Sequence, residues 1–112
     1  RLTTEGMFPY AAAKAGLTGL TRSLALDYGP FNIRVNAVLP GWTRTSAVED
    51  WFSRQNDPEA AEQQVVKTQP LRRIALPDEI ASVVAFLASD EASAITGAEI
   101  AADCGLGAKY AG

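Results

Sequence analysis

The chain has 112 residues, of which 47% are apolar and 21% charged, the composition of one small globular domain. Its formal net charge of −3 and the lack of a basic run argue against nucleic acid as a partner. No apolar run approaches the roughly 20 residues of a membrane span, and no signal peptide is present, so we expect no membrane partner. A single cysteine, Cys104, predicts a cytoplasmic protein without an intrachain disulfide, and the absence of histidine excludes histidine triads and most zinc sites.

Residues 9–30, PYAAAKAGLTGLTRSLALDYGP, predict one long helix with almost no charged face. At 100° per residue, one stripe of this helix contains Tyr10, Lys14, Leu17, Leu24 and Tyr28. Apolar or small residues occupy nearly all the other positions, so the helix should be covered on more than one side. We expect Gly29 to be its left-handed cap and Pro30 to prevent its continuation.

Tyr10 and Lys14 stand four residues apart and therefore on the same face of this helix. A lysine on an apolar stripe needs polar groups or a ligand as partners, because an unpaired inward charge is costly. A free tyrosine has a pKa of about 10, and a nearby ammonium group lowers it. The pair is thus a candidate general acid/base for an alcohol or carbonyl, although this spacing alone also occurs by chance in many helices.

After this helix, alternating apolar residues predict a strand over residues 33–39 that ends at Pro40-Gly41. Ser46 and Glu49 have the spacing of a capping box and predict the start of a short helix.

A further helix should begin at Asp57-Pro58 and continue to about Lys67. From Pro77 the apolar spacing is again helical, and residues 98–102 predict a last short strand. The glycines at 105 and 107 are expected to belong to a tail without a following helix.

The predicted order is therefore helix, strand, helical insertion, helix and strand. Such a strand–helix–strand unit is an α/β crossover with parallel strands and right-handed connection. Two parallel strands do not make an independently stable sheet, and parallel sheets need cover on both faces. The pattern predicts the second half of a larger α/β domain.

Three segments resemble the classical short-chain dehydrogenase/reductase family. YAAAK is similar to its Tyr-x-x-x-Lys signature, and AGLTGLTRSLALDYGPFNIRVNAVLPG resembles the continuation through the next strand. LRRIALPDEIASVVAFLASDEASAITGAEIAADCG resembles the C-terminal part of the family. The likeness covers nearly the whole chain in the same order. It implies that residues 1–112 form one partial domain, the C-terminal half of a Rossmann-type, doubly wound parallel sheet.

The resemblance implies an NAD- or NADP-dependent oxidoreductase that interconverts a small alcohol and a carbonyl compound. Tyr10 would exchange a proton with the substrate oxygen. Lys14 would hold the nicotinamide ribose and lower the tyrosine pKa. The cofactor-binding residues that it implies are Tyr10, Lys14, Pro40, Gly41, Thr43 and Thr45. Among these, the backbone of Thr43 and the side chain of Thr45 would meet the nicotinamide carboxamide.

The resemblance also assigns residues 46–69 to a variable substrate lid. The aromatic residues in and beside this lid are Trp42, Trp51 and Phe52. They suggest an apolar or ring-bearing substrate, but they could equally be core residues. Asn36 is expected to have a structural role. Cys104 stands where the family commonly has glycine, and we interpret it as a packing residue.

Other parts of the family pattern are missing. The chain contains no Gly-x-x-x-Gly-x-Gly phosphate loop, and the family's catalytic serine would precede Arg1. We therefore expect the 112 residues to be inactive alone and to form a homo-oligomer or associate with a missing N-terminal half. The alternative is a shortened, non-catalytic remnant that acts as a self-associating structural module. Neither the choice between NAD and NADP nor the substrate follows from these residues.

Overall fold

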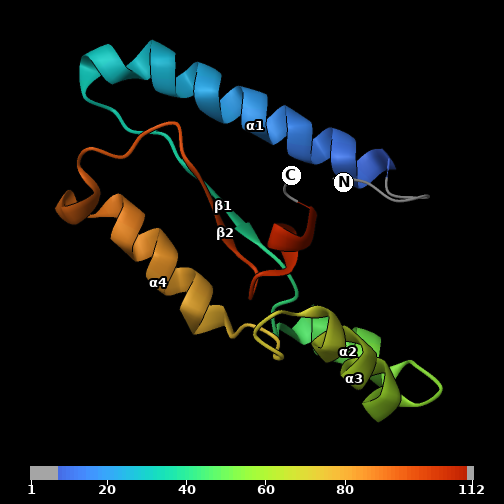
Figure 1. Cartoon of the computed structure of the whole chain (residues 1–112). Helices are drawn as coiled ribbons and strands as arrows, with labels where there is room; N and C mark the ends of the chain where they lie inside the picture. Colours follow the sequence, from blue (N-terminus) through green and yellow to red (C-terminus); the bar gives the residue numbers. More distant parts are fainter. Residues whose placement is uncertain (1–7, 111–112) are drawn as a thin grey trace.

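The computed structural model describes the backbone of residues 8–110 and the side chains of residues 12–108. In chain order its elements are α1 (Phe8–Tyr28), the 3-10 helix η1 (Gly29–Phe31), β1 (Ala37–Pro40), α2 (Ser46–Ser53), α3 (Pro58–Thr68), α4 (Pro77–Ala88), η2 (Asp90–Ala92), β2 (Glu99–Ala102) and η3 (Leu106–Tyr110). Figure 1 shows a two-stranded sheet with α1 on one side and α4 on the other, while α2 and α3 lie beyond the end of β1. The predicted α/β class and order of elements are confirmed.

The strands β1 and β2 are parallel, as predicted, with Ala37 paired to Glu99 and Pro40 paired to Ala102. Parallel neighbours require a long crossover, which α2, α3 and α4 supply. The last strand lies within the predicted range. The first strand begins at Ala37 instead of residue 33, so the alternating pattern extends beyond the paired ladder.

The Asn36 side chain explains this shorter strand. Its Nδ2 donates to the Ile95 carbonyl at 2.9 Å, and its Oδ1 accepts from the Ala98 N–H at 3.0 Å. These two bonds replace ladder bonds and align the start of β2 with β1. The predicted structural role of Asn36 is therefore confirmed.

Arg34 ties the chain before β1 to the C-terminal end of α4. Its guanidinium donates to the carbonyl oxygens of Leu87 at 2.6 Å and Ser89 at 3.1 Å, and more weakly to that of Ile95 at 3.4 Å. Carbonyls at a helix C-terminus lack partners within the helix, and a cation there also complements the helix dipole. Arg34 thus fixes α4 against the sheet.

We predict that Arg34→Met lowers the free energy of unfolding by about 2 kcal/mol, because charge-assisted bonds to partly buried carbonyls are lost. The midpoint of urea denaturation measures this change. Arg54→Met is the matched control. Within the described residues the Arg54 side chain pairs only with the exposed Asp50, so this substitution should change stability by less than about 1 kcal/mol. Equal midpoints for the two variants would contradict the role of Arg34.

The face of α1 that turns toward the sheet differs from the predicted stripe. The less exposed positions are Lys14, Thr18, Thr21, Leu24 and Ala25. Leu17 and Tyr28, which the prediction placed on the inner stripe, are exposed. The buried Thr21 satisfies its hydroxyl by donating to the Leu17 carbonyl at 2.7 Å. Small residues and threonines therefore face the sheet, and most leucines do not.

This face of α1 approaches β2 closely at Gly97. A Cβ added to Gly97 would lie 3.4 Å from the Ala25 Cβ, and Gly97 has a φ of +73°. Both observations favour glycine at the entry to β2.

Both helices beside the sheet expose apolar side chains on their outer faces. Leu20 and Leu26 of α1 are 56% and 78% exposed, and Val84 and Phe86 of α4 are also exposed. The radius of gyration is 16.2 Å, whereas a compact chain of this length has about 13 Å. The expectation that this sequence leaves sides of its first helix uncovered is confirmed for the described residues. None of the helices that the structure describes has the length and apolarity to cross a bilayer.

Two predicted helix caps are wrong, although α1 ends directly before Gly29 and α2 begins at Ser46. Gly29 is not left-handed but opens η1, and Asn32 takes the left-handed conformation with φ 59° instead. Asparagine tolerates this conformation better than most residues. The capping box of Ser46 and Glu49 is also absent, because Thr45 is the cap of α2. The predicted start of α3 at Asp57-Pro58 is confirmed, and the Asp57 carboxylate caps the helix by accepting from the Ala60 N–H at 3.1 Å.

Candidate active site

The helix α1 carries the predicted acid/base pair toward the carboxyl end of the sheet. It runs antiparallel to the strands, so its N-terminal half lies toward the end at which β1 and β2 finish (Figure 1). Lys14 is half-buried on the face that includes Thr18, whereas Ala13 and Ala15 are exposed. Tyr10 lies in α1 one turn before Lys14 and has the same helical phase. The side chain of Tyr10 lies outside the described part of the structure.

Pro40 and Gly41 end β1 beside the turn that follows β2. A Cβ added to Gly41 would lie 2.8 Å from the Asp103 Cβ and 3.2 Å from its Cα. No side chain fits there without displacing backbone. Gly41 is therefore required by a close approach of two chain segments, whether or not a cofactor also passes it.

Thr43 is buried in the segment that leaves β1. This segment forms a parallel bridge with Ala75, in which Arg44 N–H donates to the Ala75 carbonyl and Ala75 N–H donates to the Trp42 carbonyl. The Thr43 hydroxyl donates to the Gly41 carbonyl at 3.1 Å. Within the described residues, the backbone N–H of Thr43 donates no hydrogen bond. The backbone donor of a buried residue normally has a partner, so the N–H of the buried Thr43 is suited to an external acceptor.

Thr45 is the N-cap of α2. Its hydroxyl oxygen accepts from the Val48 N–H at 3.3 Å. A threonine hydroxyl can accept and donate at once, so its proton remains available to a second group. The structure thus gives Thr45 a local role that the resemblance did not imply, without removing its capacity to bind a ligand.

Arg44 joins the two helices of the insertion. Its Nη1 lies 2.7 Å from Glu49 Oε1 on α2 and 2.9 Å from Glu62 Oε1 on α3. The hydrogen bond from Arg44 holds the pKa of the Glu62 carboxyl below its usual value. This three-residue cluster explains why Glu49 is not part of a capping box: its carboxylate pairs with Arg44 instead.

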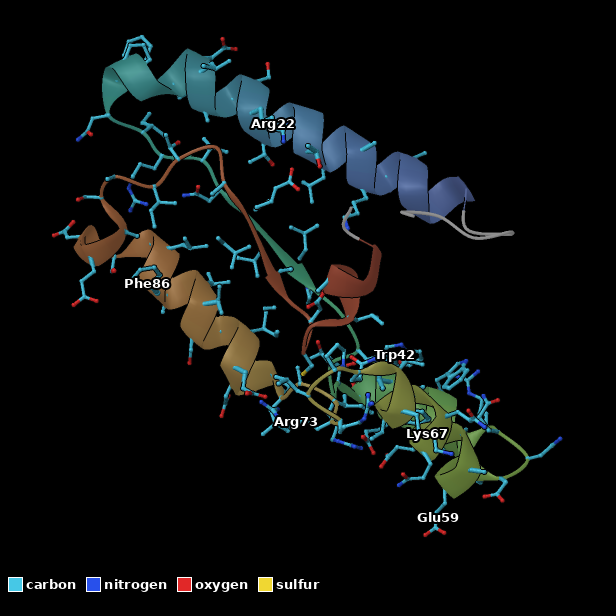
Figure 2. The ribbon with its side chains drawn as sticks, viewed as in Figure 1. Arg22, Trp42, Glu59, Lys67, Arg73 and Phe86 are labelled. Atoms are coloured by element: carbon cyan, nitrogen blue, oxygen red, sulfur yellow. The ribbon has the colours of Figure 1, made fainter. Side chains whose placement is uncertain are left out.

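The three aromatic residues of the predicted lid pack against one another. The ring centroid of Trp42 lies 5.4 Å from that of Trp51 and 5.8 Å from that of Phe52. Phe52 is buried, as the core interpretation predicted, whereas Trp51 is 45% exposed. Figure 2 shows Trp42 at the base of the α2–α3 pair, on the side nearest the sheet.

The insertion also has a groove of its own between α2 and α3. It has a volume of about 620 Å³ and an acidic lining that includes Glu49, Asp57, Glu59 and Glu62 around Phe52. None of the predicted site residues lines it. This groove is therefore separate from the candidate active site.

The predicted residues come from two places in the fold. Residues 40–45 are contiguous and leave the end of β1, while Lys14 lies on α1. No hydrogen bond between Lys14 and residues 40–45 occurs in the described part of the chain. Both nevertheless lie toward the carboxyl end of the parallel strands, where ligands bind in open α/β sheets.

Sequence reasoning missed Arg34, Arg44 and Asp103. Arg44 bonds to Glu62, which is 18 residues away, and Arg34 bonds to the Leu87 carbonyl at the end of α4, which is 53 residues away. No local sequence pattern reveals such distant partners. Asp103 had a detectable signal. An aspartate two residues before a glycine is typical of a turn in which the carboxylate binds the backbone, and Asp103 does accept from Gly105.

Comparison with known proteins identifies the family to which this chain belongs. The family model described as enoyl-(acyl carrier protein) reductase matches residues 2–107. The chain belongs to the short-chain dehydrogenase/reductase family. Oxidoreductase UcpA of Salmonella typhimurium is 45% identical over 102 residues, which cover 89% of this chain and 39% of UcpA.

Solved structures agree in fold. A short chain dehydrogenase family protein from Francisella tularensis has a TM-score of 0.87 and 36% identity, covering 96% of this chain and 46% of that one. YwfH, an NADPH-dependent reductase involved in bacilysin biosynthesis, has a TM-score of 0.83 and 32% identity, covering 93% and 41%. The chain thus spans about two fifths of the length of the relatives it matches.

Proposed function

We propose that this chain supplies the acid/base pair and the nicotinamide-facing segment of an NAD- or NADP-dependent oxidoreductase that interconverts a small alcohol and a carbonyl compound. The observation that carries the proposal is the buried Thr43, whose backbone N–H has no acceptor within the described residues. It lies on the segment that the family resemblance assigns to the nicotinamide carboxamide. The similarity to YwfH, described as NADPH-dependent, supports the same cofactor class.

The residues present fit a nicotinamide at this edge of the sheet. The Thr43 N–H would donate to the carboxamide oxygen, and the Thr45 hydroxyl retains a proton to donate beside it. When bound, the nicotinamide would supply or accept the hydride.

The chemistry of the proton would belong to Tyr10 and Lys14. In carbonyl reduction, the Tyr10 hydroxyl gives its proton to the substrate oxygen as negative charge develops there. In alcohol oxidation, the phenolate takes that proton. The Lys14 ammonium favours the phenolate and lowers the tyrosine pKa toward the working pH. The half-buried position of Lys14 on the sheet-facing side of α1 supports this role.

The direct test is a hydride-transfer assay of the complete gene product that contains this chain. NADH or NADPH consumption is followed with a panel of small aldehydes and ketones, and the product alcohol is identified. We expect turnover with at least one cofactor and one carbonyl. The absence of both turnover and cofactor binding would reject the proposal.

A second candidate function is a self-associating, non-catalytic module, which the exposed leucines at 20 and 26 of α1 favour. Both candidates predict that the 112-residue polypeptide alone associates, because it exposes apolar helix faces and strand edges. It should not bind a dinucleotide with micromolar affinity, because it has no glycine-rich phosphate turn.

Sedimentation and calorimetric titration with NADH and NADPH measure these two properties of the isolated polypeptide. A monodisperse monomer that binds either cofactor at micromolar concentration would contradict the prediction. The two candidates separate in the complete gene product, where only the enzyme binds the cofactor.

A further inference from the structure

The turn that follows β2 contacts the chain on both sides of the insertion at residues 46–69. We call residues 103–107 the Asp103 turn. On one side, Gly41 approaches Asp103 so closely that a Cβ would lie 2.8 Å from the Asp103 Cβ. On the other side, the Cys104 carbonyl accepts from the Leu71 N–H at 3.1 Å. A Cβ added to Gly105 would lie 2.9 Å from the Pro70 ring. The turn therefore touches the chain just before and just after the insertion.

The carboxylate of Asp103 holds this turn in shape. Its Oδ1 accepts from the Gly105 N–H at 3.0 Å, and its Oδ2 accepts from the Gly107 N–H at 2.8 Å. Hydrogen bonds to an ionised carboxylate are stronger than those between neutral groups. The turn also contains two left-handed residues, Cys104 with φ 55° and Gly105 with φ 91°. Cys104 is strained there, because it has a Cβ, so the turn depends on the bonds that close it.

The two segments beside the turn are also bonded to each other. The Arg44 N–H donates to the Ala75 carbonyl at 2.8 Å, and the Ala75 N–H donates to the Trp42 carbonyl at 3.1 Å. The segment from 41 to 45, the segment from 70 to 75 and the Asp103 turn thus form one assembly. Within it, Thr43 and Thr45 are positioned relative to β1.

We infer that Asp103 is a positioning residue of the candidate active site. Its carboxylate fixes the turn against which the 41–45 segment and the end of the insertion are held. The inference rests on the proposed function, because it assigns a consequence for cofactor binding. Loss of the carboxylate should loosen the segment that meets the nicotinamide and leave the proton-transfer pair on α1 intact.

Asp103→Asn is the test variant, because it keeps the side-chain volume but turns one acceptor oxygen into an NH₂ group facing a backbone N–H. In the complete gene product, we expect KM for the nicotinamide cofactor to rise about tenfold, the effect of one lost charge-assisted bond, with kcat within about twofold of wild type. Glu91→Gln removes the same charge at an exposed position of η2 and should change neither constant. A fall in kcat without a change in KM would overturn the inference.

Amide hydrogen exchange without substrate separates this inference from the proposed function. In Asp103→Asn, the amides of Leu71, Gly105 and Gly107 should exchange about tenfold faster, because their bonds depend on the turn. The Ala37 amide, which donates to the Ala98 carbonyl at 2.9 Å, should be unchanged. Faster exchange at all of these amides, or at none, would overturn the positioning role. A wild-type protein without oxidoreductase activity would instead reject the proposed function.

Gly107→Ala provides a second variant if Asp103→Asn does not fold. The added Cβ would lie 2.8 Å from Asp103 Oδ2 and would displace the same carboxylate. Gly107 does not have a positive φ, so alanine introduces no backbone strain of its own. The same rise in KM and the same local increase in exchange are expected. Wild-type KM and exchange in this variant would overturn the inference.

Discussion

Replacing Tyr10 by phenylalanine in the complete gene product is expected to lower hydride-transfer turnover by about 10² to 10⁴, the usual contribution of a general acid/base. The substitution removes only the hydroxyl oxygen. The reason lies in the phase of α1: Tyr10 is one turn before the half-buried Lys14, on the face that also contains Thr18 and Thr21. The variant lacks the hydroxyl that we propose as the proton donor to the substrate oxygen.

The measurement is kcat with saturating cofactor and substrate. Tyr28→Phe is the matched control, because Tyr28 ends the same helix at an exposed position and should retain wild-type turnover. The thermal unfolding midpoint of the Tyr10→Phe variant should remain close to that of the wild type, which shows that the protein is still folded. Near wild-type turnover of that variant would remove Tyr10 from the reaction.

Lys14→Met is expected to have two effects with one cause. Loss of the ammonium removes the proposed hydrogen-bond donor to the nicotinamide ribose, so cofactor affinity should fall by about tenfold or more. The tyrosine also loses a nearby positive charge, so its pKa rises. Alcohol oxidation needs the phenolate. The rise of kcat/KM for oxidation with increasing pH should therefore occur at higher pH in the variant than in the wild type.

Cofactor titration and the pH dependence of kcat/KM measure the two effects separately. Arg22→Met is the control, since it removes a positive charge from an exposed position of the same helix. If Lys14→Met changed neither the affinity nor the pH profile, Lys14 would have a structural role only. A change in cofactor affinity without a change in the pH profile would support the contact between Lys14 and the ribose. It would reject the proposal that Lys14 lowers the tyrosine pKa.

Local patterns predicted most of the elements in this chain. Asp57 followed by proline marked the start of α3, and the apolar spacing from Pro77 identified α4, because caps and periodicity act within one or two helical turns. The same reasoning failed at Gly29 and Ser46. There, neighbouring residues competed for the same role, and Asn32 and Thr45 took it.

The candidate site was predicted in part for a similar reason. Residues 40–45 are contiguous, so their place after β1 follows from the chain order. The face of α1 did not follow, because almost every position is apolar or small. Close packing against Gly97 selected the side with Ala25 and Thr21 over the leucines.

The sequence by itself determined the family, the parallel strand–helix–strand order and the spacing of Tyr10 and Lys14, since these depend on residue types along the chain. Only the tertiary structure decided which face of α1 turns inward, and how Arg34, Arg44 and Asp103 are used. Each of these arginines bonds to partners that include groups far away in sequence, and Asp103 acts by holding a turn against Gly41 and Pro70. Such contacts depend on how the elements pack against one another, and hydrophobic periodicity indicates only which face of an element is apolar.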